Sequence, residues 1–151
     1  MCDTVYKEKQ TVTETDSTNF ENVSGVNFYA HMDANSLEGT IFEGRVAHGY
    51  FILSKAAGLF VEAKKGPVLL NYGIDECRFT KPVYPGTTIG VKLTVKEKID
   101  QEKRSEEDVA KGIVKYYVEV YDDTEEVVAV TTILNPIIHL GSAMLISPIV
   151  A

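Results

Sequence analysis

The most regular feature of the chain is a run of apolar residues from His48 to about Ala63 that recur at helical spacing. The other sides of this segment are also largely apolar, and a helix that is apolar nearly all round is typically buried. Small residues at 56–58 would let a sheet approach it closely. Two lysines, a glycine and a proline at 64–67 predict its end, because cations, Gly and Pro favour a helix C-terminus in that order.

The segments after this helix show the alternation of apolar and polar residues that indicates half-buried strands. Proline and glycine at 82–86 mark a turn, the charged stretch Asp100–Lys111 is typical of a solvated hairpin loop, and Asp122-Asp123 makes a second turn. One long helix followed by an antiparallel meander predicts an α+β domain whose sheet wraps the helix. The predicted strands cover Val68–Tyr72 with a continuation at Cys77–Phe79, then Ile89–Val95, Val114–Val120 and Val127–Leu134.

The first 45 residues carry weaker signals. Thr11–Thr13 is polar and β-branched, and it predicts an edge strand. The Thr15–Ser17 segment offers N-caps for a short helix through Phe20 and Val23. Glycines at 25, 39 and 44 among small polar residues predict a loop with short helical turns.

The composition is that of one soluble globular domain, with 151 residues of which 44% are hydrophobic and 25% are charged. We assign residues 1–138 to the domain and 139–151 to an apolar tail that docks on a neighbouring subunit or is disordered. The net charge of −7, without a large basic cluster, argues against nucleic acid as a partner. Cys2 and Cys77 stand in no metal or redox spacing and indicate reduced thiols in a cytoplasmic protein. No signal peptide or membrane helix is expected, because the N-terminus is polar and no apolar run approaches ~20 residues.

Many short segments, in one order from about residue 10 to residue 135, carry a resemblance to a known family. They are Thr11–Asp16, Phe28–Asp33, Arg45–Phe51, Ala56–Val61, Gly66–Val68, Asn71–Gly73, Arg78-Phe79 and Lys81–Gly86. On these segments the chain resembles the MaoC-like hotdog hydratases, the (R)-specific enoyl-CoA hydratases. The resemblance is strongest to the hydratase domain of the bifunctional ring-opening enzyme of phenylacetate degradation. It implies a hotdog fold, in which an antiparallel sheet wraps one long central helix.

The resemblance also implies a mechanism. In this family an Asp and a His five positions apart hold and activate one water, which adds to C3 of an unsaturated acyl-CoA. Backbone N–H groups at the start of the central helix stabilise the enolate that forms at the thioester oxygen. His31 takes the role of general base and acid, and Gly49 the role of enolate donor. No metal is implied, and no cofactor beyond the coenzyme A of the substrate.

The residues taken alone leave other interpretations open. His31 fits a core histidine bonded to a backbone carbonyl, and Gly49 fits a packing glycine where loop meets helix. His48 fits either a substrate-facing side chain or a residue that starts the helix. Four aromatic residues are candidates for lining an acyl pocket or for the ordinary core, and they are Phe28, Tyr29, Tyr50 and Phe51.

The chain departs from the family pattern at Val26, where the catalytic Asp is expected. Valine can neither orient water nor exchange a proton, and loss of a general acid–base group costs about 10²–10⁴ in rate. Asp33 is a weak substitute, because it lies two residues beyond His31. Three explanations stay open. The chain is a homologue that lost hydration but kept acyl-CoA binding, a variant that traps substrate, or an enzyme that uses His31 alone on a more reactive substrate.

We therefore predict an enoyl-CoA hydratase-like lyase that acts on an unsaturated acyl-CoA thioester, with turnover impaired by Val26. The alternatives are a non-catalytic acyl-CoA-binding hotdog module and a hotdog thioesterase. A homo-oligomer, at least a dimer, is also implied, because hotdog sheets pair edge to edge and an open edge strand invites pairing.

Overall fold

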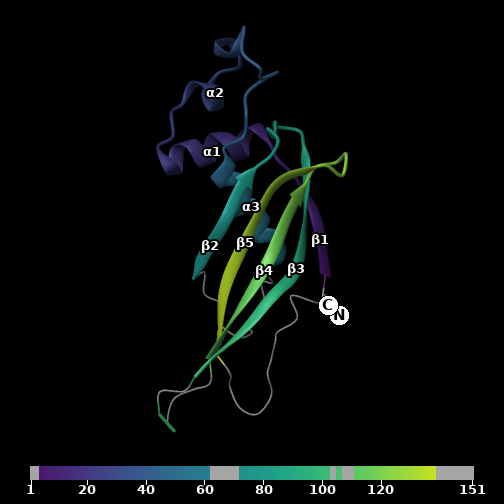
Figure 1. Ribbon diagram of the computed structural model, residues 1–151. Coiled ribbons are helices and arrows are strands. Elements are labelled where there is room, and N and C mark those ends of the chain that lie inside the picture. Colours follow the sequence, from purple (N-terminus) through teal and green to yellow (C-terminus); the bar gives the residue numbers. More distant parts are fainter. Residues whose placement is uncertain (1–3, 62–71, 103–104, 107–110, 139–151) are drawn as a thin grey trace.

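The structure is a computed structural model that describes residues 4–61, 72–102, 105–106 and 111–138 (Figure 1). Cys2, the predicted helix stop at 64–67, most of the predicted strand at 68–72 and the 139–151 tail lie outside the described residues. The elements in chain order are β1 (Thr4–Thr11), α1 (Glu14–Ser24), α2 (Tyr29–Met32), the 3₁₀ turn η1 (Ala34–Leu37), α3 (Gly49–Phe60), β2 (Gly73–Phe79), β3 (Thr88–Gln101), β4 (Lys111–Tyr121) and β5 (Val127–Ile138).

The five strands form one antiparallel sheet in the order β1-β3-β4-β5-β2. The sheet twists across α3, which lies behind it in Figure 1. The predicted α+β hotdog arrangement is therefore confirmed. Among the described residues, β1 pairs only with β3. The edge strand expected at residues 11–13 therefore exists but runs over residues 4–11. β5, the last predicted strand along the chain, is an interior strand of the sheet, because it pairs with β4 on one side and with β2 on the other.

The core is the layer between α3 and the concave face of the sheet. On α3, Ile52, Ala56 and Phe60 recur every four residues and are buried. The alternation predicted for the central strands is confirmed, since every second residue from Ile89 to Leu93 in β3 and from Gly112 to Val120 in β4 is buried. Beyond a register shift after Val95, the rest of β3 is intermediate or exposed. The sheet residues in the core are Ile89, Val91, Leu93, Val114, Tyr116, Val118, Val120, Val128, Ala129 and Ile133.

The prediction that α3 is buried all round was wrong. Only one row of its residues is fully buried, and Ser54, Tyr50 and Gly58 are exposed, because a single sheet covers only one side of a helix. A Cβ at Gly58 would meet no atom within 4 Å, so the absence of a side chain there does not serve close approach of the sheet. The helix begins at Gly49 and ends at Phe60, where Val61 turns to an extended conformation.

α1 is capped two residues earlier than the sequence suggested. Thr13 is the N-cap, and its hydroxyl accepts from the Asp16 N–H at 3.0 Å while Asp16 Oδ2 accepts from the Thr13 N–H at 3.0 Å. This capping box gives Asp16 the third helical position rather than the cap. The helix has 11 residues and ends at Gly25, whose φ of 73° is left-handed. Val26 therefore follows directly after a helix end.

Candidate functional site

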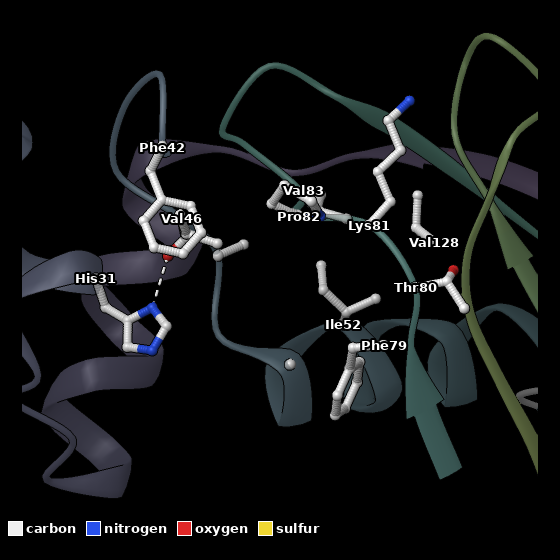
Figure 2. A pocket seen from close by; sticks show the side chains of 12 residues that line it. His31, Phe42, Val46, Ile52, Phe79, Thr80, Lys81, Pro82, Val83 and Val128 are labelled. Atoms are coloured by element: carbon white, nitrogen blue, oxygen red, sulfur yellow. Dashed lines mark hydrogen bonds between the residues drawn. The ribbon is translucent and has the colours of Figure 1, made fainter. Parts of the chain in front are cut away.

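Three hydrogen bonds hold the end of α2, with His31, against the Arg45-Val46 segment, and we call them the His31 clamp. Its Nδ1 lies 2.8 Å from the carbonyl oxygen of Val46 (Figure 2). The Val46 N–H donates to the Ala30 carbonyl at 2.9 Å, and Arg45 Nε donates to the His31 carbonyl. A carbonyl oxygen only accepts, so Nδ1 carries the proton in the His31 bond. Neutral His31 then has its lone pair on Nε2, the atom that can take up a proton.

His31 lies on α2, a helix so short that most of its side chains stay outside the core. α2 has four residues and buries only Ala30. The Asp33 N–H closes it by donating to the Tyr29 carbonyl at 3.1 Å. The Asp33 carboxylate is exposed and accepts from the Asn35 N–H at 2.9 Å, where it caps η1. Asp33 is therefore engaged as a cap and does not line the pocket beside His31.

A pocket of about 290 Å³ opens beside His31, a size at the lower end of ligand sites. Figure 2 shows His31 and Phe42 on one side and Val83 and Val128 on the other, with Ile52 between them on α3. Most of the wall is apolar, so the pocket suits a hydrocarbon chain better than a polar ligand. The full lining is His31, Phe42, Val46, Ala47, Gly49, Ile52, Phe79, Thr80, Lys81, Pro82, Val83 and Val128.

The start of α3 forms one wall of this pocket. The first N–H groups of a helix have no partner within the helix and carry a partial positive charge. Here the Tyr50 N–H donates to His48 Nδ1 at 3.3 Å. Within the described part of the chain, the Gly49 N–H has no such partner, and Gly49 lines the pocket. This N–H can therefore donate to an oxyanion.

Gly49 also packs against the ring of Phe79, which lies at the end of β2. A Cβ at position 49 would lie 2.7 Å from Cζ of the Phe79 ring, well inside van der Waals contact. The ring lines the pocket and is 48% exposed. The packing interpretation of Gly49 thus has a specific partner. Glycine meets both needs here, close packing under a ring and an accessible N–H.

Exchange of Gly49 for Ala should push the Phe79 ring out of place and lower the free energy of unfolding by up to about 1 kcal/mol, because the end of the ring is half exposed and can move. Gly58→Ala is the matched control in the same helix, because its Cβ meets nothing. It should raise the free energy of unfolding by about 0.4–1 kcal/mol. Urea denaturation measures both. The double change Gly49→Ala with Phe79→Ala should recover part of the loss, and equal effects of the two glycine changes would contradict this packing.

His48 is the N-cap of α3 and lies beside His31, with 4.8 Å between ring centroids. Its ring also stacks near Phe20, at 5.3 Å. Burial, and then the neighbouring His31, lower the pKa of His48, which favours the neutral ring whose Nδ1 accepts from Tyr50. His48 does not line the pocket. The structure thus gives it the helix-starting role, and its predicted contact with substrate stays a prediction.

The other predicted site residues lie around the pocket rather than in it. Phe28, Tyr29 and Tyr50 are about half to two-thirds exposed, at 53%, 48% and 67%. They join His31 and His48 in a series of ring contacts over the surface. They belong neither to the core nor to the pocket lining. Phe28 and Tyr29 lie at the start of α2, which buries only Ala30, and Tyr50 lies on the side of α3 that the sheet does not cover. Phe51 is half-buried and packs against the core.

Val26 is half-buried, and its N–H donates to Ser24 Oγ at 3.3 Å. It does not line the pocket. The structure therefore joins His31 and Gly49 at one pocket, and places Val26 in the turn between α1 and the segment that carries His31. The roles assigned to these three positions stay predictions.

Sequence reasoning assigned no role to several residues that line the pocket. The segment 79–83 crosses the start of α3, with the Lys81 side chain extending away from Ile52 in Figure 2. A signal was present, because Phe79 and Lys81–Val83 belong to the segments that carry the family resemblance. Nothing in their local pattern, however, predicts that the end of β2 lies over a helix start.

Lys81 is tied to the turn between β4 and β5 through Asp122. The Asp122 carboxylate is 6% exposed and accepts from Lys81 Nζ at 2.7 Å, Thr124 N–H at 2.9 Å and Glu126 N–H at 3.1 Å. Burial raises the pKa of Asp122, but the Lys81 ammonium and these donors outweigh burial and hold the pKa well below its usual range. The carboxylates of Asp122 and Glu126, which both pair with Lys81 Nζ, in turn raise the pKa of Lys81.

This pairing should make the protein less stable in acid. The folded pKa of Asp122 is depressed, so its contribution is present above the unfolded pKa of about 4 and is lost as the pH falls below it. We expect Asp122→Asn to be less stable than the wild type at pH 7, with the gap narrowing towards pH 3. Urea denaturation at several pH values measures this. Asp123→Asn, an exposed neighbour, is the control, and parallel pH profiles for wild type and Asp122→Asn would contradict the expectation.

Three absences hold for the described residues only. None of the helices in residues 4–61, 72–102, 105–106 and 111–138 is long and apolar enough to cross a membrane. Cys77 is a free thiol. In the same residues, no group of three or more His, Cys, Asp or Glu side chains could hold a metal ion.

Comparison with known sequences gives a family match over most of the chain. The family model described as MaoC like domain matches residues 3–116. Protein MaoC of Klebsiella aerogenes is 48% identical over 108 residues, which are 72% of this chain and 32% of that protein. The chain thus spans about a third of the length of this curated relative.

Solved structures are similar over nearly the whole chain. A monoamine oxidase regulatory protein from Archaeoglobus fulgidus has a TM-score of 0.80 and 27% identity, over 93% of this chain and 91% of that one. The (R)-hydratase of A. caviae involved in PHA biosynthesis has a TM-score of 0.64 and 16% identity, over 89% and 93%. A Mycobacterium tuberculosis protein with a double hotdog fold has a TM-score of 0.78 and 14% identity, over 94% and 43%. The last two likenesses establish a common fold.

Proposed function

Because the chain belongs to the MaoC-like domain family, we propose that it binds an α,β-unsaturated acyl-CoA thioester beside His31 and adds water to its double bond. The observation that carries this proposal is the bond between His31 Nδ1 and the Val46 carbonyl. It leaves Nε2 of the neutral ring unprotonated at the mouth of an apolar pocket. An (R)-hydratase with the same fold supports the reaction class.

In the proposed reaction, His31 Nε2 takes a proton from water while the water oxygen bonds to C3 of the acyl chain. The C2–C3 double bond becomes a single bond, and its electron pair moves onto the thioester as an enolate. The enolate oxygen accepts from the Gly49 N–H at the start of α3, an interaction typically worth about 3 kcal/mol in the transition state. Protonation of C2 completes the addition, and a histidine can return the proton that it took.

The acyl chain is proposed to lie along the apolar wall formed by Ile52, Val83 and Val128. Ile52 comes from α3, Val83 from the segment before β3, and Val128 from β5. Side chains of the protein core would therefore hold the acyl chain of the substrate. The coenzyme A part of the substrate is the only cofactor that this reaction needs. We propose a cytoplasmic homodimer that pairs through sheet edges, in keeping with β2, an edge strand with exposed Ile74.

The pathway is part of the same proposal. From the sequence resemblance, we propose a hydratase domain like that of the bifunctional ring-opening enzyme of phenylacetate degradation. The matched stretch is 32% of the curated MaoC relative, which is in keeping with a hydratase as one part of a longer protein. Such a domain would act on a ring-derived unsaturated acyl-CoA.

A second candidate rests on Val26. No described carboxylate lines the pocket with His31, so a chain without the family's Asp suits an acyl-CoA-binding module that does not turn over. The two candidates share the pocket and differ only in catalysis.

One pair of measurements separates them. Calorimetry with butyryl-CoA, which cannot be hydrated, reports binding, and free coenzyme A is the control ligand. Loss of the enoyl-thioester absorbance of crotonyl-CoA reports hydration. We expect binding together with slow hydration that His31→Ala abolishes. Background hydration by the wild type, together with binding that survives His31→Ala, supports the binding module. Absence of both binding and hydration in the wild type contradicts both candidates.

A further inference from the structure

Arg45 connects α1 to the clamp around His31. Its Nη2 donates to both carboxylate oxygens of Glu21 at 2.7 Å each, and to Thr18 Oγ1 at 3.1 Å. Nη1 donates to Glu14 Oε2 at 2.8 Å, and Nε donates to the His31 carbonyl. One guanidinium thus joins two turns of α1 to the end of α2.

The contact with Glu21 is the buried part of this network. The side chains of Arg45 and Glu21 are 16% and 7% exposed, whereas Glu14 is 66% exposed. Glu21 raises the pKa of Arg45, against an opposing effect of burial. When one partner of a buried pair is removed, the other charge stays buried without compensation. Arg45 is therefore fixed by Glu21 far more firmly than by Glu14.

The residue after Arg45 decides which nitrogen of His31 carries the proton. Val46 offers its carbonyl to His31 Nδ1 and its N–H to the Ala30 carbonyl. Because Arg45 and Val46 are adjacent, fixing the Arg45 side chain to α1 also fixes the position of that carbonyl. No residue of α1 lines the pocket. Phe20 of α1 contacts the ring of His48, and the Arg45 network is the connection from α1 that reaches the segment bonded to His31 Nδ1.

We propose that the Arg45–Glu21 ion pair is a positioning device that holds His31 in the tautomer with a bare Nε2. This rests on the proposed function in one respect, that His31 is the reacting base. Without the pair, the 45–46 segment can shift and the Val46 carbonyl leaves Nδ1. The neutral ring then places its proton on either nitrogen, and molecules with a protonated Nε2 cannot accept a proton from water. Arg45 and Glu21 are positioning residues that touch no substrate.

The tautomer can be measured directly by ¹⁵N NMR of histidine-labelled protein without ligand, at pH 8, where free imidazole is neutral. The protonated and bare nitrogens of a neutral ring differ widely in chemical shift. We expect wild-type His31 to show a bare Nε2 and a protonated Nδ1. Glu21→Gln should move a large fraction of His31, about half, to the other tautomer. Glu14→Gln is the matched control, because it removes the exposed partner of the same guanidinium, and it should leave His31 unchanged.

Arg45→Lys provides a second variant if Glu21→Gln does not fold. A lysine keeps a cation for Glu21 but cannot reach Glu21 and the His31 carbonyl together, so the tautomer should shift again. A His31 that keeps its bare Nε2 in either folded variant overturns the proposal, as does a wild type with the proton on Nε2.

Failure of this proposal differs from failure of the proposed function, because the NMR measurement uses no substrate. In a protein that hydrates crotonyl-CoA, Glu21→Gln should lower kcat about twofold, in proportion to the molecules whose Nε2 becomes protonated. KM should change little, since the pocket wall is untouched. A protein that never hydrates crotonyl-CoA contradicts the proposed function and leaves the tautomer result standing. If the protein hydrates crotonyl-CoA and Glu21→Gln leaves its kcat unchanged, the positioning role is contradicted and the proposed function is not.

Discussion

Exchange of Val26 for Asp should raise the rate of crotonyl-CoA hydration by about 10²-fold or more. A general acid–base group typically contributes about 10²–10⁴ in rate, and position 26 is where the family resemblance puts the carboxylate that works with His31. The position suits the change. Val26 is half-buried in the turn after Gly25, and Asp has nearly the same volume as Val, so the substitution adds no bulk.

Val26→Asn is the control for this prediction, because it has the shape of Asp but cannot exchange a proton. We expect it to hydrate at the wild-type rate, and butyryl-CoA affinity to stay within about threefold in all three proteins. Initial rates and calorimetry measure the two quantities. Equal rates for Val26→Asp and Val26→Asn would show that position 26 takes no part in proton transfer. An unchanged Val26→Asp rate with intact binding would favour the binding module.

The elements that the sequence predicted correctly are those with a strong period. β3, β4 and the buried row of α3 follow directly from alternation at two residues or recurrence near four. The same signal failed where burial depends on partners far along the chain. Apolar residues on every side of α3 suggested complete burial, but the sheet covers one side, and exposure of Tyr50 is a property of the assembled fold.

The site was predictable only in part, for a similar reason. His31 and Gly49 could be named from the sequence, and they do line one pocket. Phe79 and Arg45 could not be given roles, because these depend on distances between elements. Phe79 matters through its contact with Gly49, thirty residues earlier, and Arg45 through a carboxylate on α1. A local pattern contains no information about either contact. The role of Thr13 as N-cap was missed for another reason. Four residues between 13 and 17 can cap a helix, and the end of β1 at Thr11 selects the first of them.

In the Val26→Asp background, His31→Gln should remove most of the gained activity, with a fall of about 10²–10⁴ in kcat. Glutamine retains a donor that can reach the Val46 carbonyl, so the clamp keeps a hydrogen bond while the base is lost. Butyryl-CoA affinity should change little, because the apolar wall of Ile52, Val83 and Val128 is untouched. Steady-state rates and calorimetry on the same preparations separate the two effects.

Asp33→Asn in the same background decides whether that nearby carboxylate can act in place of an Asp at position 26. Asn keeps an oxygen that can accept from the Asn35 N–H, so the cap of η1 persists while the ionisable group is gone. Because the Asp33 carboxylate is turned into this cap and lies outside the pocket, we expect an unchanged rate in the Val26→Asp protein and in the wild type. A tenfold loss in the wild type alone would instead assign Asp33 to the residual reaction. In that case His31 would not be the only acid–base group of the reaction. Asp33 would carry the second proton in the slow hydration by the wild type, which has valine at position 26.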